Sequence, residues 1–264
     1  MKVQTTLRNI VRHLLESLTK NIVYSIDFSG VTIKRKGGIG FLRTSNFNIV
    51  EKDFLASLNL KGKTIYDIGG HIGVFSIFFS KMSGANGNVF TFEPNSENIK
   101  KINDNIMLNN IDNVKIIDYG ISDKRENVEL FVRKGASATG SMNINIQSTI
   151  ADEKYYEILE VKVDALDNLI VNNHLPLPEF IKVDIEGMEY FGLLGMQDTI
   201  MKKYPELYIE IHGSNSDDKL SMIRQVSTLL FDMSYKIYHV ESGENINKDN
   251  YSIAKEGHIY CTHE

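Results

Sequence analysis

Short apolar segments alternate with segments of helical periodicity from residue 64 onward. The expected strands lie at residues 64–68, 88–92, 114–117, 180–183 and 207–211, and helices follow most of them, the clearest at 96–109. Strands that are apolar along their whole length are typical of a parallel sheet buried on both faces. The sequence therefore predicts an α/β fold, with helices covering both faces of a mostly parallel sheet.

Two later segments depart from this alternation. Residues 120–165 contain expected strands at 128–132 and 159–163 around a Gly/Ser/Thr-rich loop at 135–141, and we interpret them as an insertion at the edge of the sheet. After a helix at 219–232, a polar loop joins two last strands, at 235–240 and 258–262. Because this loop holds no crossover helix, the last strand is expected to run antiparallel.

Residues 1–50 are interpreted as an appendage to a main domain at 51–264. Apolar residues recur with helical spacing over 5–20, which predicts an amphipathic helix. We expect it to pack on the main domain; a homodimer contact, a substrate lid and membrane-surface docking are the alternatives. Residues 31–36 and 39–42, separated by Gly37-Gly38, predict a β-hairpin with a basic tip.

Composition excludes several classes of protein. The 264 residues include one cysteine, which excludes a cysteine-rich zinc site and favours a reducing, cytoplasmic compartment. The 29 Lys and Arg against 34 Asp and Glu give a net charge of −5, so no nucleic-acid partner is expected. No apolar run approaches the roughly 18 residues of a membrane span, and charged residues interrupt the N-terminal stretch where a secretory signal would lie.

A glycine-rich turn follows the first parallel strand. Asp67 is followed by Gly69, Gly70, His71 and Gly73, and then by an apolar helix. Glycines allow backbone amides to approach a ligand closely, but this spacing is not the G-x-G-x-x-G of a pyrophosphate cradle. A carboxylate before the turn would repel pyrophosphate and accept hydrogen bonds from a cationic amino group. The turn therefore favours a nucleoside that carries an amino acid.

The ends of the next two strands extend this interpretation. The strand at 88–92 ends in Glu93-Pro94, and a carboxylate at this place can accept both hydroxyls of a ribose. The third strand ends near Asp118, Tyr119 and Gly120, which we expect to pass the adenine. All of these residues are assigned to cofactor binding.

At this point the sequence resembles the FkbM family of S-adenosylmethionine-dependent methyltransferases, over about residues 50–215. The resemblance rests on the motifs at 67–73, 92–95, 163–167 and 181–189, and on the apparent fifth strand at 204–212. The most specific of them is the K-x-D-x-E-G-x-E run at 182–189. The family often has Ala-Asn where this chain has Gly70-His71.

The resemblance implies a Rossmann-like class I methyltransferase fold, with a seven-stranded sheet, S-adenosyl-L-methionine over the ends of the first strands, and O-methylation of a hydroxyl. A hydroxyl needs a positioned base to take its proton. Asp184, Glu186 and His212 are the candidate catalytic residues, and which of them is the base is left open. With Glu210, they could converge on one crevice. Such donors also suit a divalent cation, although the sequence assigns no metal.

Three functions are compatible with these observations. The leading one is methylation of a hydroxyl on a sugar, glycan or secondary metabolite. The alternatives are a non-catalytic nucleoside-binding module of the same fold and an RNA methyltransferase. An amino-group methyltransferase usually carries an Asn/Asp-Pro-Pro-aromatic turn after the fourth strand, where this chain reads Asp-Ile-Glu-Gly at 184–187. The sequence does not identify the methyl acceptor, because we expect residues 1–50 and 133–155 to select it and they contain no motif for a particular substrate.

Overall fold

The computed structural model describes residues 18–19, 21–37, 49–133, 140–141 and 156–263. The helix expected at 5–20 lies outside the described residues, except for 18–19. The strand expected at 39–42 and most of the loop at 135–141 lie outside them as well. Within the described part, no helix is both long enough and apolar enough to cross a membrane.

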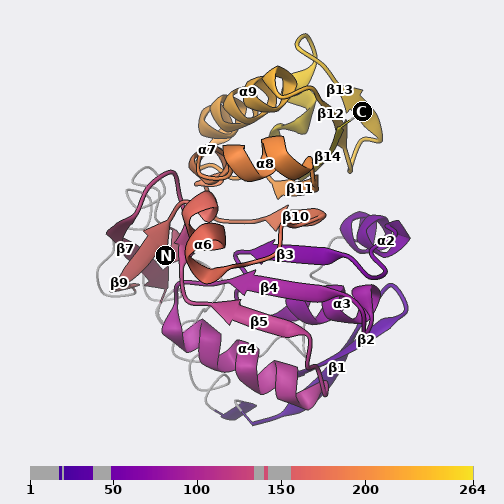
Figure 1. The fold of residues 1–264 in the computed structure, drawn as a ribbon, viewed down its shortest axis with the longest axis vertical. Coiled ribbons are helices and arrows are strands. Elements are labelled where there is room, and N and C mark those ends of the chain that lie inside the picture. Colours follow the sequence, from indigo (N-terminus) through magenta and orange to yellow (C-terminus); the bar gives the residue numbers. More distant parts are fainter. Residues whose placement is uncertain (1–17, 20, 38–48, 134–139, 142–155, 264) are drawn as a thin grey trace, which may run out of the picture.

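The main sheet has eight strands in the order β13-β12-β14-β11-β10-β3-β4-β5 (Figure 1). Its strands are β3 (Thr64–Ile68), β4 (Asn88–Phe92), β5 (Val114–Ile117), β10 (Phe180–Val183), β11 (Glu206–Glu210), β12 (Tyr235–His239), β13 (Glu244–Ile246) and β14 (His258–His263). The five strands from β11 to β5 are parallel, whereas β14 runs antiparallel to both β11 and β12. The seven expected strands and the antiparallel last strand are confirmed, and β13 adds an eighth strand at one edge.

Helices cover both faces of this sheet, as predicted. One face packs against α2 (Ile49–Ser57), α3 (Val74–Ser83) and α4 (Ser96–Leu108). The other packs against α6 (Leu166–Asn173), α7 (Glu189–Leu194), α8 (Gln197–Lys203) and α9 (Ser216–Asp232), with the 3₁₀ turn η3 (Tyr251–Lys255) beside α9.

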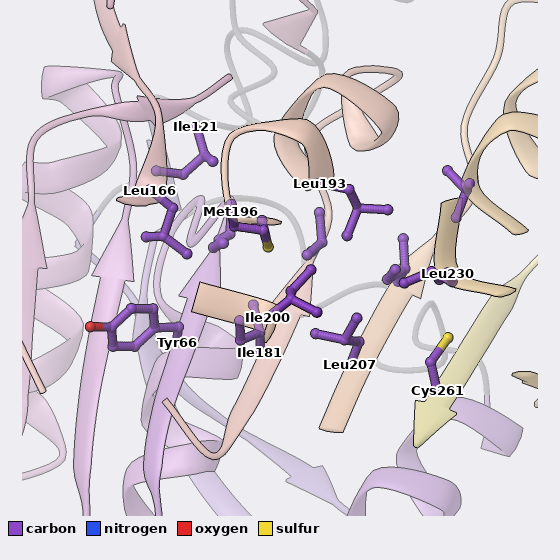
Figure 2. Close-up of a cluster of buried hydrophobic side chains, with 14 of the residues drawn as sticks. Tyr66, Ile121, Leu166, Ile181, Leu193, Met196, Ile200, Leu207, Leu230 and Cys261 are labelled. Atoms are coloured by element: carbon purple, nitrogen blue, oxygen red, sulfur yellow. The ribbon is translucent and has the colours of Figure 1, made fainter. Parts of the chain in front are cut away.

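Alternate strand residues fill two separate cores. Tyr66 and Ile181 point toward α6 and α8 and pack with Leu166 and Ile200 (Figure 2). Each fully buried side chain of this size contributes roughly 1.5–3 kcal/mol. Cys261 is buried in the same core, and burial raises the pKa of its thiol. Its environment is that of a structural cysteine rather than a nucleophile.

The described part of the N-terminal region forms a hairpin that the sequence did not predict. Residues 31–36 form the predicted strand, β2 (Val31–Lys36), and it pairs with β1 (Val23–Phe28). Residues 39–42, the predicted partner, lie outside the described residues. Ser29 and Gly30, both at positive φ, make the two-residue turn, a geometry that matches the twist of paired strands. The basic residues of β2 therefore lie along a strand that pairs with β1. The division into an appendage and a main domain stays a prediction.

The segment after β5 forms a second sheet instead of extending the main one. Its strands are β6 (Gly120–Ile121), β7 (Glu126–Arg133), β8 (Gly140–Ser141) and β9 (Tyr156–Asp164), in the order β6-β9-β7-β8. The strands expected at 128–132 and 159–163 are thus present as an antiparallel pair. This small sheet stands at the C-terminal ends of the parallel strands (Figure 1).

Candidate active site

The turn after β3 requires glycine because two loops meet there. Gly69 has φ +86°, and a Cβ on it would lie 1.8 Å from the backbone oxygen of Asp184. The amides of Gly69 and Gly70 both donate to the carbonyl of Phe92, at 3.0 and 3.1 Å. The turn is thereby held against the ends of both β4 and β10.

A pocket opens beside this turn, at the C-terminal ends of β3, β4 and β10. Its walls are formed by Gly69, His71, Phe92, Glu93, Pro94, Asn95, Asn98, Gly120, Ile121, Leu130, Val132, Asp184, Ile185 and Glu186. Seven of the residues assigned from sequence are among them: Gly69, His71, Glu93, Pro94, Gly120, Asp184 and Glu186.

The other assigned residues lie elsewhere in the described structure. Gly70 and Gly73 shape the turn and the start of α3. Asp118 is exposed, while Tyr119 packs against the hydrophobic core. Asp67 is fully buried below the pocket.

Glu93 is fixed by three hydrogen bonds. Its Oε2 accepts from the amide of His71 at 2.8 Å, and its Oε1 accepts from the amide of Asn95 at 3.0 Å and from Asn98 Nδ2 at 3.2 Å. Burial raises the pKa of Glu93 to about 7, although these hydrogen bonds oppose the shift. The carboxyl group is therefore rigid and changes protonation near neutral pH.

Two buried polar atoms beside Glu93 have no hydrogen-bond partner among the described residues. They are Nε2 of His71 and Oδ1 of Asn98, and both residues line the pocket. Burial and the nearby Arg35 lower the pKa of His71 to about 4, so its ring is neutral. Because buried polar groups are rarely left unsatisfied, these atoms indicate a polar ligand.

Asp67 and Lys182 lie side by side on the parallel strands β3 and β10. Asp67 Oδ2 accepts from Ser76 Oγ at 2.6 Å, and Lys182 Nζ donates to Asp184 Oδ2 at 2.8 Å. Burial alone would raise the pKa of Asp184, but Lys182 and His212 together outweigh it and hold the pKa below its usual value. Asp67 therefore interacts electrostatically with Lys182 inside the sheet, and Asp184 is ionised at the pocket wall.

Acidic side chains surround His212 at the ends of β10 and β11. Its Nε2 lies 3.5 Å from Glu210 Oε1, 3.8 Å from Glu186 Oε2 and 3.9 Å from Asp184 Oδ1. Burial lowers the pKa of His212, but Glu189 and the other carboxylates raise it to about 10. Burial also raises the pKa of Glu186 to about 7. The structure thus brings the four predicted residues together, although His212 stands behind the pocket wall.

Glu189 contacts both His212 and the turn that carries Glu186. Its side chain is fully buried at the start of α7, where Oε1 accepts from the amide of Gly187 and lies 3.0 Å from His212 Nδ1. Glu186 and Gly187 both have positive φ, 53° and 96°. Glu189 therefore holds both the tight turn that carries Glu186 and the orientation of the imidazole.

Comparison with known proteins identifies the family. A model described as the methyltransferase FkbM domain matches residues 67–237, from Asp67 on β3 to Ile237 on β12. The chain belongs to the FkbM methyltransferase family. Membership of this family is what the motifs predicted.

Two relatives of this FkbM protein are informative. It is 25% identical over 149 residues to the hexuronic acid methyltransferase AglP of Haloferax volcanii, and the match covers 56% of each protein. It is also similar to the crystal structure of methyltransferase FkbM from Methylobacillus flagellatus KT, with a TM-score of 0.51 and 16% identity, over 80% of this chain and 46% of that one. The second likeness confirms the fold.

Sequence reasoning missed one wall of the pocket in this FkbM-family protein. Leu130 and Val132 of β7 line it together with Ile121 of β6. They alternate along the strand expected at 128–132, which the sequence places in an insertion at the edge of the main sheet without assigning it to the cofactor site. Asn98 was also missed, although it lies five residues after Glu93 in the first turns of an expected helix.

Proposed function

We propose that this FkbM-family methyltransferase transfers a methyl group from S-adenosylmethionine to a hydroxyl of a sugar or glycan. The observation that carries the proposal is the shared pocket of Glu93, Asp184 and Glu186. A buried carboxylate suited to a ribose and two carboxylates suited to a reacting hydroxyl face the same space. The likeness to a hexuronic acid methyltransferase supports a carbohydrate acceptor.

The pocket residues fit the cofactor. Glu93, held rigid by its three donors, would accept hydrogen bonds from the ribose hydroxyls. His71 Nε2 and Asn98 Oδ1 would gain the partners that they lack. The apolar side chains of Ile121 and Leu130 would cover the adenine.

The bound cofactor supplies an electrophilic methyl group on a sulfonium sulfur. The protein must then hold the acceptor oxygen in line with it and remove the hydroxyl proton. We assign proton removal to Glu186, which lines the pocket. Asp184 also lines the pocket, but one of its carboxylate oxygens accepts a hydrogen bond from Lys182. Asp184 would therefore orient the acceptor hydroxyl.

His212 is assigned a positioning role. Among the residues considered as the base, it alone does not line the pocket, and its Nδ1 is engaged by Glu189. Through Nε2 it faces Asp184 and Glu186 at 3.9 and 3.8 Å, and so supports both carboxylates from behind.

Calorimetry with S-adenosylhomocysteine, followed by a methyl-transfer assay, tests the proposal. The acceptor panel should contain neutral sugars, uronic acids and their glycosides, with RNA as a separate arm. We expect saturable cofactor binding and methylation of at least one carbohydrate hydroxyl. If S-adenosylhomocysteine does not bind, the assignment of this pocket to the cofactor is wrong. Binding without turnover on the panel would favour the non-catalytic module, and methylation of RNA alone would favour the nucleic-acid enzyme.

A further inference from the structure

We propose that Asp184, Glu210 and His212 form a site for one divalent cation beside the cofactor pocket. Each residue offers one donor atom, and the three atoms lie within 4.8 Å of one another. Two carboxylate oxygens and one imidazole nitrogen suit Mn²⁺ or Mg²⁺. These residues end two neighbouring parallel strands, so the fold itself brings the donors together.

The spacing of the donors fits an ion better than direct contacts. His212 Nε2 is 3.5 Å from Glu210 Oε1 and 3.9 Å from Asp184 Oδ1, longer than the roughly 2.7–3.2 Å of ordinary hydrogen bonds. Ligands bound at roughly 2.1–2.4 Å to one cation lie roughly 3–4.5 Å apart. The donors are thus arranged around a common point rather than paired with each other.

The orientation of the imidazole supports the same conclusion. His212 Nδ1 lies 3.0 Å from Oε1 of the fully buried Glu189, and Nε2 faces the carboxylates. Metal-binding histidines usually donate one ring N–H to a carboxylate in this way, which directs the other nitrogen at the metal. Glu189 would act as the positioning residue of the site.

Glu189 requires a positive charge on the His212 side. Its second oxygen, Oε2, is buried and has no hydrogen-bond partner among the residues that the structure describes. A buried carboxylate with an unsatisfied oxygen is unfavourable unless positive charge lies nearby. The protonated His212 ring supplies this charge while the site is empty, and when the ring is neutral a divalent ion on its far side would supply it instead.

The role of the cation, unlike its binding, rests on the proposed function. Asp184 both lines the pocket and belongs to the donor set. A cation there could bind the oxygen of the acceptor hydroxyl and make its proton more acidic. Glu186, whose Oε2 lies 3.8 Å from His212 Nε2, would then receive the proton.

Titration with Mn²⁺, followed by calorimetry and by electron paramagnetic resonance, tests the site on protein first treated with EDTA. The variants are Glu210→Gln and His212→Gln, and the matched control is Glu206→Gln at the other end of β11, which pairs with Lys63. We expect one saturable Mn²⁺ site in the wild type and in the control. Each of the two other variants should bind at least about tenfold more weakly. Circular dichroism and thermal unfolding check that each variant is folded.

The outcomes separate the two proposals. If the wild type shows no saturable Mn²⁺ binding up to about 1 mM, or if Glu210→Gln binds as tightly as the control, the cation site is wrong even where S-adenosylhomocysteine binds. Mn²⁺ binding that is lost in both variants supports the site, whether or not the protein binds the nucleoside. Absence of nucleoside binding would count only against the proposed function.

Discussion

Lys182 Nζ donates to Asp184 Oδ2 at 2.8 Å, from a side chain that is 1% exposed. The same ammonium lies 4.5 Å from the centroid of the Phe75 ring, and Asp67 is its partner on the neighbouring strand. The buried ammonium of Lys182 therefore interacts electrostatically with Asp67 inside the sheet and donates a hydrogen bond to Asp184 at the wall of the pocket.

Lys182→Met should destabilise the protein by about 3–5 kcal/mol, because it leaves the buried Asp67 and the partly buried Asp184 without their cation. Urea unfolding measures this change. Lys202→Met, which removes an exposed pair with Asp198 on α8, is the control and should change stability little. Equal effects of the two substitutions would show that Lys182 does not hold the carboxylates.

Gly69→Ala should be far more harmful than Gly62→Ala. Both glycines have positive φ, so both substitutions carry a backbone cost of roughly 1–2 kcal/mol. Only at Gly69 does the added Cβ meet another chain segment, the Asp184 carbonyl, whereas nothing lies within 4 Å at Gly62. Thermal unfolding and S-adenosylhomocysteine affinity should both fall for Gly69→Ala. Similar melting temperatures for the two variants would contradict the close approach of the loops.

The sequence predicted those parts of the fold that depend on local pattern. The glycine turn at 69–73, the strand ends at Glu93 and Asp184, and the meeting of Glu186 with His212 follow from strand order and from the rule that parallel strands end at one edge. The pairing of β2 with β1 was not predicted, because it forms through the turn at 29–30, earlier in the chain than Gly37-Gly38, and long-range packing favours it. Phe28 and Ile33 are both fully buried in the main core, which fixes the earlier turn.

The position of the second sheet could not be predicted in the same way. Its contact with the pocket depends on how β6 and β9 pair after the main sheet ends at β5, and nothing local specifies that pairing. The homodimer contact through residues 5–20, the cytoplasmic location and the absence of a nucleic-acid partner all stay predictions.

Leu130→Ala should weaken S-adenosylhomocysteine binding by roughly 1–2 kcal/mol, through lost apolar contact with the adenine. Leu130 is 6% exposed and lines the pocket. Ile158→Ala on the paired strand β9, where the side chain is 54% exposed, is the matched control. Calorimetry that gives equal affinities for the two folded variants would exclude β7 from the cofactor site.

Cofactor affinity should depend on pH through Glu93. Its carboxyl has a pKa of about 7 in the folded protein because burial disfavours the charged form. Ribose hydroxyls donate hydrogen bonds, so the ionised form binds better, and S-adenosylhomocysteine affinity should rise between about pH 6 and pH 8. His71 does not titrate in this range, because its pKa is lowered to about 4. Calorimetry at several pH values measures the slope.

Glu93→Gln should remove this slope and leave binding weaker at the upper end of the range. Glu97→Gln, at an exposed position on the first turn of α4, should keep the slope of the wild type. Protein stability follows the opposite trend to affinity. The folded state holds the Glu93 proton more tightly than the unfolded chain, so its contribution is lost as the pH rises from the ordinary value toward 7. A Glu93→Gln variant that retains the slope in affinity would mean that another pocket group, such as Glu186 with its pKa of about 7, controls the pH dependence instead of Glu93.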